Sequence, residues 1–231
     1  MPVAVLVSGS GSNLQALIDR AQDGTLAATI ALVVSNKPDA YGLERARRHN
    51  IPWVCIRHTD YPDRPAFDRA MIAAIRAAGA RAVALAGFMR MITPEFIQAF
   101  EGRVINIHPA LLPSFPGIRG QSDAAAYGVT LAGCTVHYVD EKMDHGPVII
   151  QAAVPAYPDD DGESLGRRIL ALEHRVFPQA LHWLATDRIR LEGRKTRILP
   201  PPGDPAPGAP QPPSPPQPTD ALVNPPLEAG F

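Results

Sequence analysis

Two side chains near the middle of the chain, Asn106 and His108, have the types and the spacing to do chemistry. They lie at the end of a predicted strand, where residues two apart point to the same side of a sheet. An amide donor beside an imidazole can bind a developing oxyanion and move a proton. Ligands of open α/β sheets bind outside the carboxyl ends of strands. For this segment alone, a histidine that satisfies local hydrogen bonds is the simpler alternative.

A loop with three carboxylates follows in the segment 140–147. One of these carboxylates, placed beside His108, would favour the protonated imidazole. Taken alone, the segment also fits a solvated loop between two strands.

The glycine-rich segment 8–13 lies between a predicted strand and a predicted helix. Backbone N–H groups and the positive end of a helix can hold a phosphate at such a place. Leu14 stands where the dinucleotide fingerprint requires a third glycine, and no Gly-Lys-Ser/Thr of a Walker loop follows. A phosphate monoester therefore fits this loop better than a dinucleotide does, although a plain tight turn is equally compatible.

Alternating strands and helices must position these segments. Continuous apolar runs, typical of strands buried on both faces, occur at 3–7, 30–34, 53–56, 82–86 and 104–107. Helical spacing or helix-start residues occur at 41–49, 67–77, 93–95 and about 162–185. The pattern predicts an α/β fold with a mostly parallel, Rossmann-like twisted sheet and helices on both faces. Further apolar runs predict two antiparallel strands and a last strand, at 131–139, 148–154 and 188–191.

The composition is that of a folded protein, because 45% of the 231 residues are hydrophobic and 19% are charged. The formal net charge is −1, whereas a general nucleic-acid binder usually carries a basic face. No apolar stretch approaches the roughly 20 residues of a membrane helix, and no basic leader precedes the first strand, so we expect a cytoplasmic protein. Cys55 and Cys134 lie in apolar runs and are expected to be buried thiols. The histidines show no zinc-type spacing.

Proline marks a change in composition near the C-terminus. Half of the 26 prolines lie in residues 200–231. We therefore expect a catalytic domain over 1–195 and a proline-rich, disordered tail over 196–231, which would bury too little apolar area to offset the entropy of ordering.

Several segments together resemble one family closely, the phosphoribosylglycinamide formyltransferases, over about residues 3–190. The matching segments, in conserved order and spacing, are 5–16, 42–46, 85–90, 106–113, 133–137 and 144–147. The resemblance implies the formyltransferase fold and transfer of a formyl group from 10-formyltetrahydrofolate, the co-substrate, to the amine of glycinamide ribonucleotide. It implies small-molecule substrates, no metal, no nucleic acid and no membrane, in a monomer or homodimer.

The resemblance also implies roles for individual residues. Asn106, His108 and Asp144 match the catalytic trio, in which Asp144 orients a protonated His108. The residues that match the ribonucleotide site are Gly11, Ser12, Asn13 and Glu173. The residues that match the folate site are Arg64, Met89, Arg90, Met91, Ile92 and Asn106, with the loop 140–144 beside the pterin.

This chain departs from the family pattern in two places within the matched region. The segment 118–122 reads Ile-Arg-Gly-Gln-Ser, where members often carry one or two histidines. His145 replaces the usual threonine beside Asp144.

Three alternatives remain open at this point. A formyltetrahydrofolate hydrolase uses the same trio with water as acceptor, but usually carries a regulatory domain before a catalytic strand that here begins at residue 3. A methionyl-tRNA formyltransferase typically has a basic, tryptophan-containing loop after the catalytic histidine and a basic C-terminal domain, whereas this chain is net −1. A non-catalytic nucleotide-binding module would use only the phosphate loop.

Overall fold

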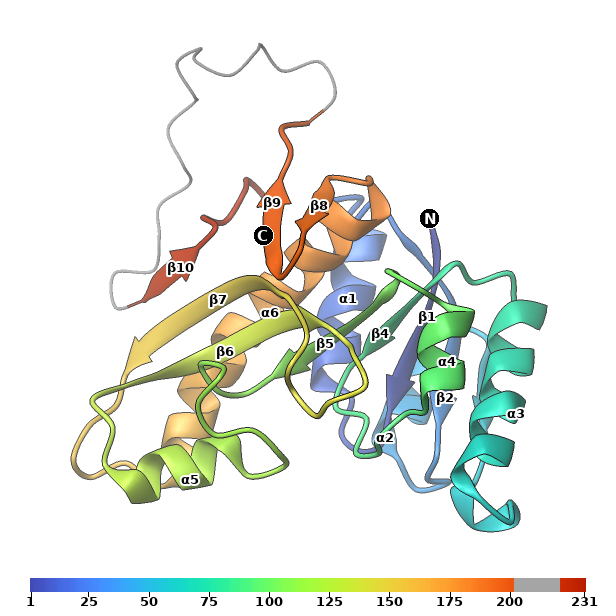
Figure 1. Ribbon diagram of the computed structural model, residues 1–231, viewed down its shortest axis with the longest axis horizontal. Coiled ribbons are helices and arrows are strands. Elements are labelled where there is room, and N and C mark those ends of the chain that lie inside the picture. The colour runs from blue at the N-terminus through green and yellow to red at the C-terminus, as the bar shows by residue number, and fades with distance from the viewer. Residues whose placement is uncertain (202–220) are drawn as a thin grey trace.

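Most strands of the protein meet in one sheet, shown by a computed structural model that describes residues 1–201 and 221–231 (Figure 1). Within these ranges the sheet has eight strands in the order β10-β7-β6-β5-β4-β1-β2-β3, and β8 and β9 form a separate hairpin. The strands are β1 (Pro2–Val7), β2 (Thr29–Ser35), β3 (Trp53–Cys55), β4 (Ala82–Leu85), β5 (Val104–His108), β6 (Leu131–Tyr138), β7 (Val148–Pro155), β8 (Ile189–Glu192), β9 (Lys195–Ile198) and β10 (Leu222–Asn224). The helices are α1 (Ser12–Gln22), α2 (Tyr41–Arg48), α3 (Arg64–Ala77), α4 (Pro94–Ala99), α5 (Gly120–Tyr127) and α6 (Gly162–Ala185), with a short 3-10 helix at His58–Asp60.

The sheet changes from parallel to antiparallel pairing at β5. Strands β3, β2, β1, β4 and β5 pair in parallel. Strands β6, β7 and β10 each run antiparallel to the neighbour before them. The predicted mostly parallel sheet and its antiparallel extension are both confirmed. Because β1, β4 and β5 are parallel neighbours, their carboxyl ends meet at one edge of the sheet, where ligands of such folds bind.

The first strand shows why helices lie on both faces of this sheet. Val3, Val5 and Val7 belong to a hydrophobic core that includes residues of α1, α2 and α6. Ala4 and Leu6 belong to a second core that includes residues of α3 and α4. All five side chains are fully buried. A strand covered on both sides has no polar face, which explains the unbroken apolar run in the sequence.

Local capping signals set where the helices begin. The Thr93 hydroxyl accepts a hydrogen bond from the backbone N–H of Phe96, and Pro94 is the first residue of α4, as predicted. Helix α6 spans the predicted residues and begins with a capping box between Asp161 and Ser164. Helix α5 was not predicted. Within residues 1–201 and 221–231, no helix has both the length and the apolarity to cross a membrane.

The expected disordered tail over 196–231 is wrong for the parts that the structure describes. The proposed boundary at residue 195 falls at the first residue of β9. Strand β10 pairs antiparallel with β7, with Val223 opposite Ala152. The rest of the expected tail, residues 202–220, lies outside the described residues.

Three apolar side chains at four-residue spacing explain why the C-terminal segment 221–231 is folded. Val223, Leu227 and Phe231 are buried in the same core as α6. The Glu228 carboxylate pairs at 2.7 Å with the guanidinium of buried Arg188. The proline-rich composition gave no sign of these anchors, because a composition averages over residues that act individually.

Replacing Leu227 by Ala tests this packing. We expect the free energy of unfolding to fall by about 2 kcal/mol, the lower end for a buried leucine, because the C-terminal segment can separate before the rest unfolds. Urea unfolding followed by circular dichroism measures the change. The control is Leu222→Ala in the same segment, where the side chain is 73% exposed. Equal stability of the two variants would contradict this packing.

Candidate active site

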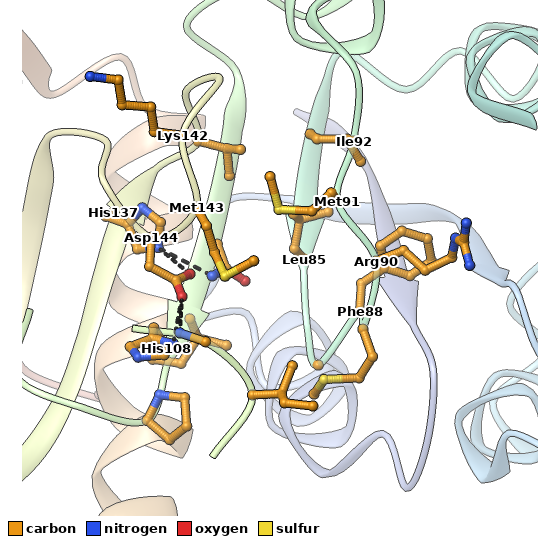
Figure 2. Close-up of a pocket in the computed structure, with 18 of the residues that line it drawn as sticks. Leu85, Phe88, Arg90, Met91, Ile92, His108, His137, Lys142, Met143 and Asp144 are labelled. Carbon is orange, nitrogen blue, oxygen red and sulfur yellow. Dashed lines mark hydrogen bonds and ion pairs between the residues drawn. The ribbon is translucent and has the colours of Figure 1, made fainter. Parts of the chain in front are cut away.

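A cavity of about 220 Å³ lies at the carboxyl ends of β4 and β5 (Figure 2). Its walls are the loop after β4, the end of β5 with the residues that follow it, and the loop between β6 and β7. The sequence-predicted residues that line it are Met89, Arg90, Met91, Ile92, Asn106, His108 and Asp144. The fold therefore brings the end of β5 and the loop between β6 and β7 to one cavity.

The His108 imidazole lies between two hydrogen-bond acceptors. Its Nε2 is 2.9 Å from the carbonyl oxygen of Phe115, and its Nδ1 is 3.5 Å from Oδ2 of Asp144. Neither a carbonyl nor a carboxylate oxygen can donate, so the doubly protonated imidazolium is the form that satisfies both neighbours. The contact to Asp144 is long for a hydrogen bond. The Nδ1 side of the ring is therefore held less tightly than the Nε2 side.

The position of Asp144 is fixed by the backbone on both sides of the cavity. Its Oδ2 accepts a hydrogen bond of 2.7 Å from the N–H of Gly117. Its own backbone has φ 49°, in the left-handed region that residues with a side chain rarely adopt. The carboxylate thus bridges the loop after β5 and the loop between β6 and β7.

His137 is a residue of this site that sequence reasoning missed. Its Nδ1 is 2.7 Å from the carbonyl oxygen of Tyr138, which fixes the proton on Nδ1. Its Nε2 therefore accepts a hydrogen bond of 3.1 Å from the amide Nδ2 of Asn106. Burial lowers the pKa of His137, which favours this neutral form. The effect is to orient the Asn106 amide and leave its second N–H available.

Gly11 closes the predicted phosphate loop against α2. It occupies the N-cap position of α1 with φ 68°, and a Cβ there would lie 2.6 Å from the Cα of Gly42. The guanidinium of Arg45 donates to the carbonyl oxygen of Ser10 at 2.9 Å. A cavity of about 400 Å³ whose lining includes Ser12 and Arg45 adjoins the loop. Positive charge and the start of a helix are therefore present where an anion was expected.

Asn13 and Glu173, two predicted ribonucleotide-site residues 160 positions apart, meet in the interior. The Asn13 Nδ2 donates to Oε2 of Glu173 at 2.7 Å. Both residues are buried. Burial raises the pKa of Glu173, and the hydrogen bond from Asn13 opposes that shift. The pair ties α1 to α6 beside the phosphate loop.

Ser8 links the phosphate loop to the loop after β4. Its hydroxyl donates to Oδ1 of Asn36 at 2.6 Å and accepts from the backbone N–H of Met89 at 2.8 Å. Ser8 therefore connects the segment that matches the ribonucleotide site to the segment that matches the folate site.

Arg64 is not part of the cavity wall. It is the first residue of α3 and is exposed, so its expected contact with a folate stays a prediction. In the segment that departs from the family pattern, Ile118 lines the cavity, whereas Arg119 is at the start of α5 with its guanidinium 3.5 Å from Asp123. The second departure, His145, lies outside the cavity lining.

Sequence comparisons place these features among known proteins. The formyl transferase family profile matches residues 1–181. The phosphoribosylglycinamide formyltransferase of Escherichia coli is 39% identical over 207 residues, which cover 88% of this chain and 98% of that protein. The trifunctional purine biosynthetic protein adenosine-3 of Drosophila pseudoobscura pseudoobscura is 50% identical over 190 residues, which cover 81% of this chain. This chain spans 14% of the length of that trifunctional relative.

Comparisons with solved structures find similar proteins of the same kind. The crystal structure of glycinamide ribonucleotide transformylase 1 from Symbiobacterium toebii matches with a TM-score of 0.85 and 47% identity, covering 86% of this chain and 94% of that one. A formyltetrahydrofolate deformylase from Pseudomonas putida matches with a TM-score of 0.77 and 30% identity, covering 86% of this chain and 69% of that one. The chain is thus more similar to the first structure than to the second.

The raised pKa of Glu173 predicts how a neutral side chain at this position changes the stability of the protein. The folded-state pKa exceeds the unfolded value, so the ionised carboxylate destabilises the protein at high pH, and this penalty vanishes below the ordinary pKa of 4.5. Glu173→Gln removes the buried charge and keeps an oxygen that accepts from Asn13. We expect the variant to be more stable than the wild type at neutral pH, by a margin that shrinks as the pH falls.

Urea unfolding of both proteins at a series of pH values measures this margin. Glu95→Gln, at an exposed position on α4, is the control and should show no such gain. A Glu173→Gln variant less stable than the wild type at every pH would refute the burial argument.

Proposed function

The chain belongs to the phosphoribosylglycinamide formyltransferase family, and we propose that it transfers the formyl group of 10-formyltetrahydrofolate to the amine of glycinamide ribonucleotide. The products are the formylglycinamide ribonucleotide and tetrahydrofolate, in de novo purine biosynthesis. The observation that carries the proposal is the cluster of Asn106, His108 and Asp144 in one cavity, in a chain that covers 98% of the Escherichia coli relative.

The proposed reaction follows from the hydrogen-bonding capacity of this cluster. The ribonucleotide amine attacks the formyl carbon, a C–N bond forms, and the formyl oxygen becomes an oxyanion. The free N–H of Asn106 and the imidazolium of His108 stabilise this oxyanion. The bond from the formyl carbon to the folate nitrogen then breaks. His108, as the imidazolium, donates a proton to the departing folate nitrogen, and the neutral ring then accepts the proton that the attacking amine loses.

Asp144 has a positioning and electrostatic role in this proposal. Its carboxylate lies 3.5 Å from His108 Nδ1, where it fixes the orientation of the ring and places a negative charge beside it. The hydrogen bond from Gly117 holds the carboxylate in that place. No metal takes part in the proposed mechanism.

The two substrates would approach from two sides of the same edge of the sheet. We assign the ribonucleotide phosphate to the N–H groups of Gly11, Ser12 and Asn13, and a further contact of the ribonucleotide to Glu173. We assign the folate to the cavity between Met89–Ile92 and the loop 140–144, with Asn106 contacting both the folate and the reacting formyl group. The apolar side chains Leu85, Phe88 and Met143 on the cavity wall suit an aromatic pterin.

A cytoplasmic location and a monomeric or homodimeric state belong to the same proposal. Cys55 and Cys134 are both free thiols, as is usual in a reducing compartment.

The first test separates the transferase from its alternatives. Purified protein is mixed with 10-formyltetrahydrofolate, and loss of the formyl group is followed with and without glycinamide ribonucleotide. We expect loss that requires the ribonucleotide and yields its formyl product. Equal loss without the ribonucleotide would instead indicate the hydrolase, which the 30% identity to a deformylase keeps as the second candidate. Absence of loss in both cases would refute both enzymes and leave a nucleotide-binding module or a tRNA acceptor.

Replacing His108 by Ala tests the catalytic assignment. We expect kcat to fall by about 10²–10⁴, the usual contribution of a general acid–base. The dissociation constant of the ribonucleotide, measured by calorimetry, should change little, because the phosphate loop and Glu173 are untouched. The control is His49→Ala, where the ring contacts two glutamines of α1 outside the cavity. Full activity in the His108 variant would overturn the assignment.

A further inference from the structure

The loop 139–147 has to reverse direction to deliver Asp144 to the site. It begins beside the start of β5, where the N–H of Val139 donates to the carbonyl oxygen of Val104 at 3.0 Å. His108 lies at the other end of β5. The loop therefore returns along β5 and places Asp144 there in a left-handed conformation. Such a conformation persists only when surrounding contacts hold it.

The β8–β9 hairpin supplies contacts of this kind at the next residue, His145. Arg194, in the turn of the hairpin, donates from Nη2 to the carbonyl oxygen of His145 at 2.6 Å. Its Nη1 lies 3.3 Å from His145 Nδ1. Thr196 fixes the hairpin itself, because its hydroxyl donates to the carbonyl oxygen of Val148 at 2.7 Å. Figure 1 shows the turn of the hairpin beside the start of β7.

Asp140 holds the same residue from inside the loop. Its Oδ2 lies 2.8 Å from His145 Nδ1, and its Oδ1 accepts from the N–H of Lys142 at 3.0 Å. His145 Nδ1 either carries a proton and donates to Asp140, or lacks the proton and accepts from Arg194, so only one of these two bonds forms at a time. The bond from Arg194 to the His145 carbonyl oxygen does not depend on this choice. It is therefore the constant link between the hairpin and the loop.

We propose that Arg194 is a positioning residue of the transfer reaction, which braces the loop 139–147 through His145 and thereby holds Asp144 beside His108. The inference rests on the proposed function for its catalytic consequence, although the brace itself does not. Arg194 is exposed and lies outside the cavity lining, so it acts through the loop rather than on a substrate. The proposal also assigns a role to His145, which departs from the family pattern: its carbonyl oxygen accepts the hydrogen bond from the hairpin.

The brace is tested without substrates, by hydrogen exchange of the full-length protein. In Arg194→Ala, we expect the amides of 140–146 to exchange about tenfold faster than in the wild type, as loss of one charge-assisted hydrogen bond predicts. The matched control is Arg197→Ala on the same hairpin, whose guanidinium contacts Glu192 and no residue of the loop. Unchanged exchange in Arg194→Ala would overturn the brace.

The catalytic consequence is tested by steady-state kinetics on the same variants. We expect kcat/KM for 10-formyltetrahydrofolate to fall about tenfold in Arg194→Ala, while KM for the ribonucleotide stays within about twofold. Arg194→Lys, which can still donate to the carbonyl oxygen, should recover part of the loss. A general loss of stability lowers the active fraction and leaves both KM values unchanged, so the thermal midpoint of each variant is measured to separate it from the positioning role.

The outcomes of the two experiments are distinguishable. Faster exchange with activity equal to that of Arg197→Ala would overturn the positioning role. A wild type with no transfer activity would refute the proposed function, while hydrogen exchange would still decide whether Arg194 braces the loop.

Discussion

Because β6 runs antiparallel to β5, His137 lies directly opposite Asn106 and fixes its amide, and the loop that follows β6 can return to His108. A further parallel strand at this position would need a crossover connection and would place its own carboxyl end at the edge instead. The change of direction therefore converts the end of β5 into a cavity with walls on two sides. The parallel strands on the other side of β5 supply the phosphate loop and the loop after β4.

Elements with strong local signals could be predicted from the sequence. The buried strand 3–7, the Thr93 cap and helix α6 follow from apolar runs, capping residues and helical spacing. Helix α5 could not be predicted, because its alanines and polar residues give no apolar face, and only Ala124 and Gly120 in it are buried. The fold of the C-terminal segment depends on contacts with α6, which is distant in sequence, so its composition was misleading.

In the candidate site, too, relations between residues near in sequence could be predicted, and relations between distant residues could not. Asn106 and His108 could be paired from their spacing, because alternation along a strand is a local rule. The partnership of Asn106 with His137 depends on strand register, and that of Asn13 with Glu173 on the packing of α1 against α6. Neither relation leaves a pattern in a single sequence. The family resemblance identified the candidate residues, but it did not predict the hydrogen bonds that orient them.

The pairing of β10 with β7 affects how separate copies of this protein can contact one another. An uncovered β7 would present a row of backbone N–H and C=O groups, the kind of edge on which sheets of separate molecules join. Residues 222–224 instead satisfy that edge opposite Gln151–Ala153. In effect the chain performs strand addition on itself, the same interaction by which sheets capture foreign peptides. The segment thus covers three of the eight residues along that edge of β7.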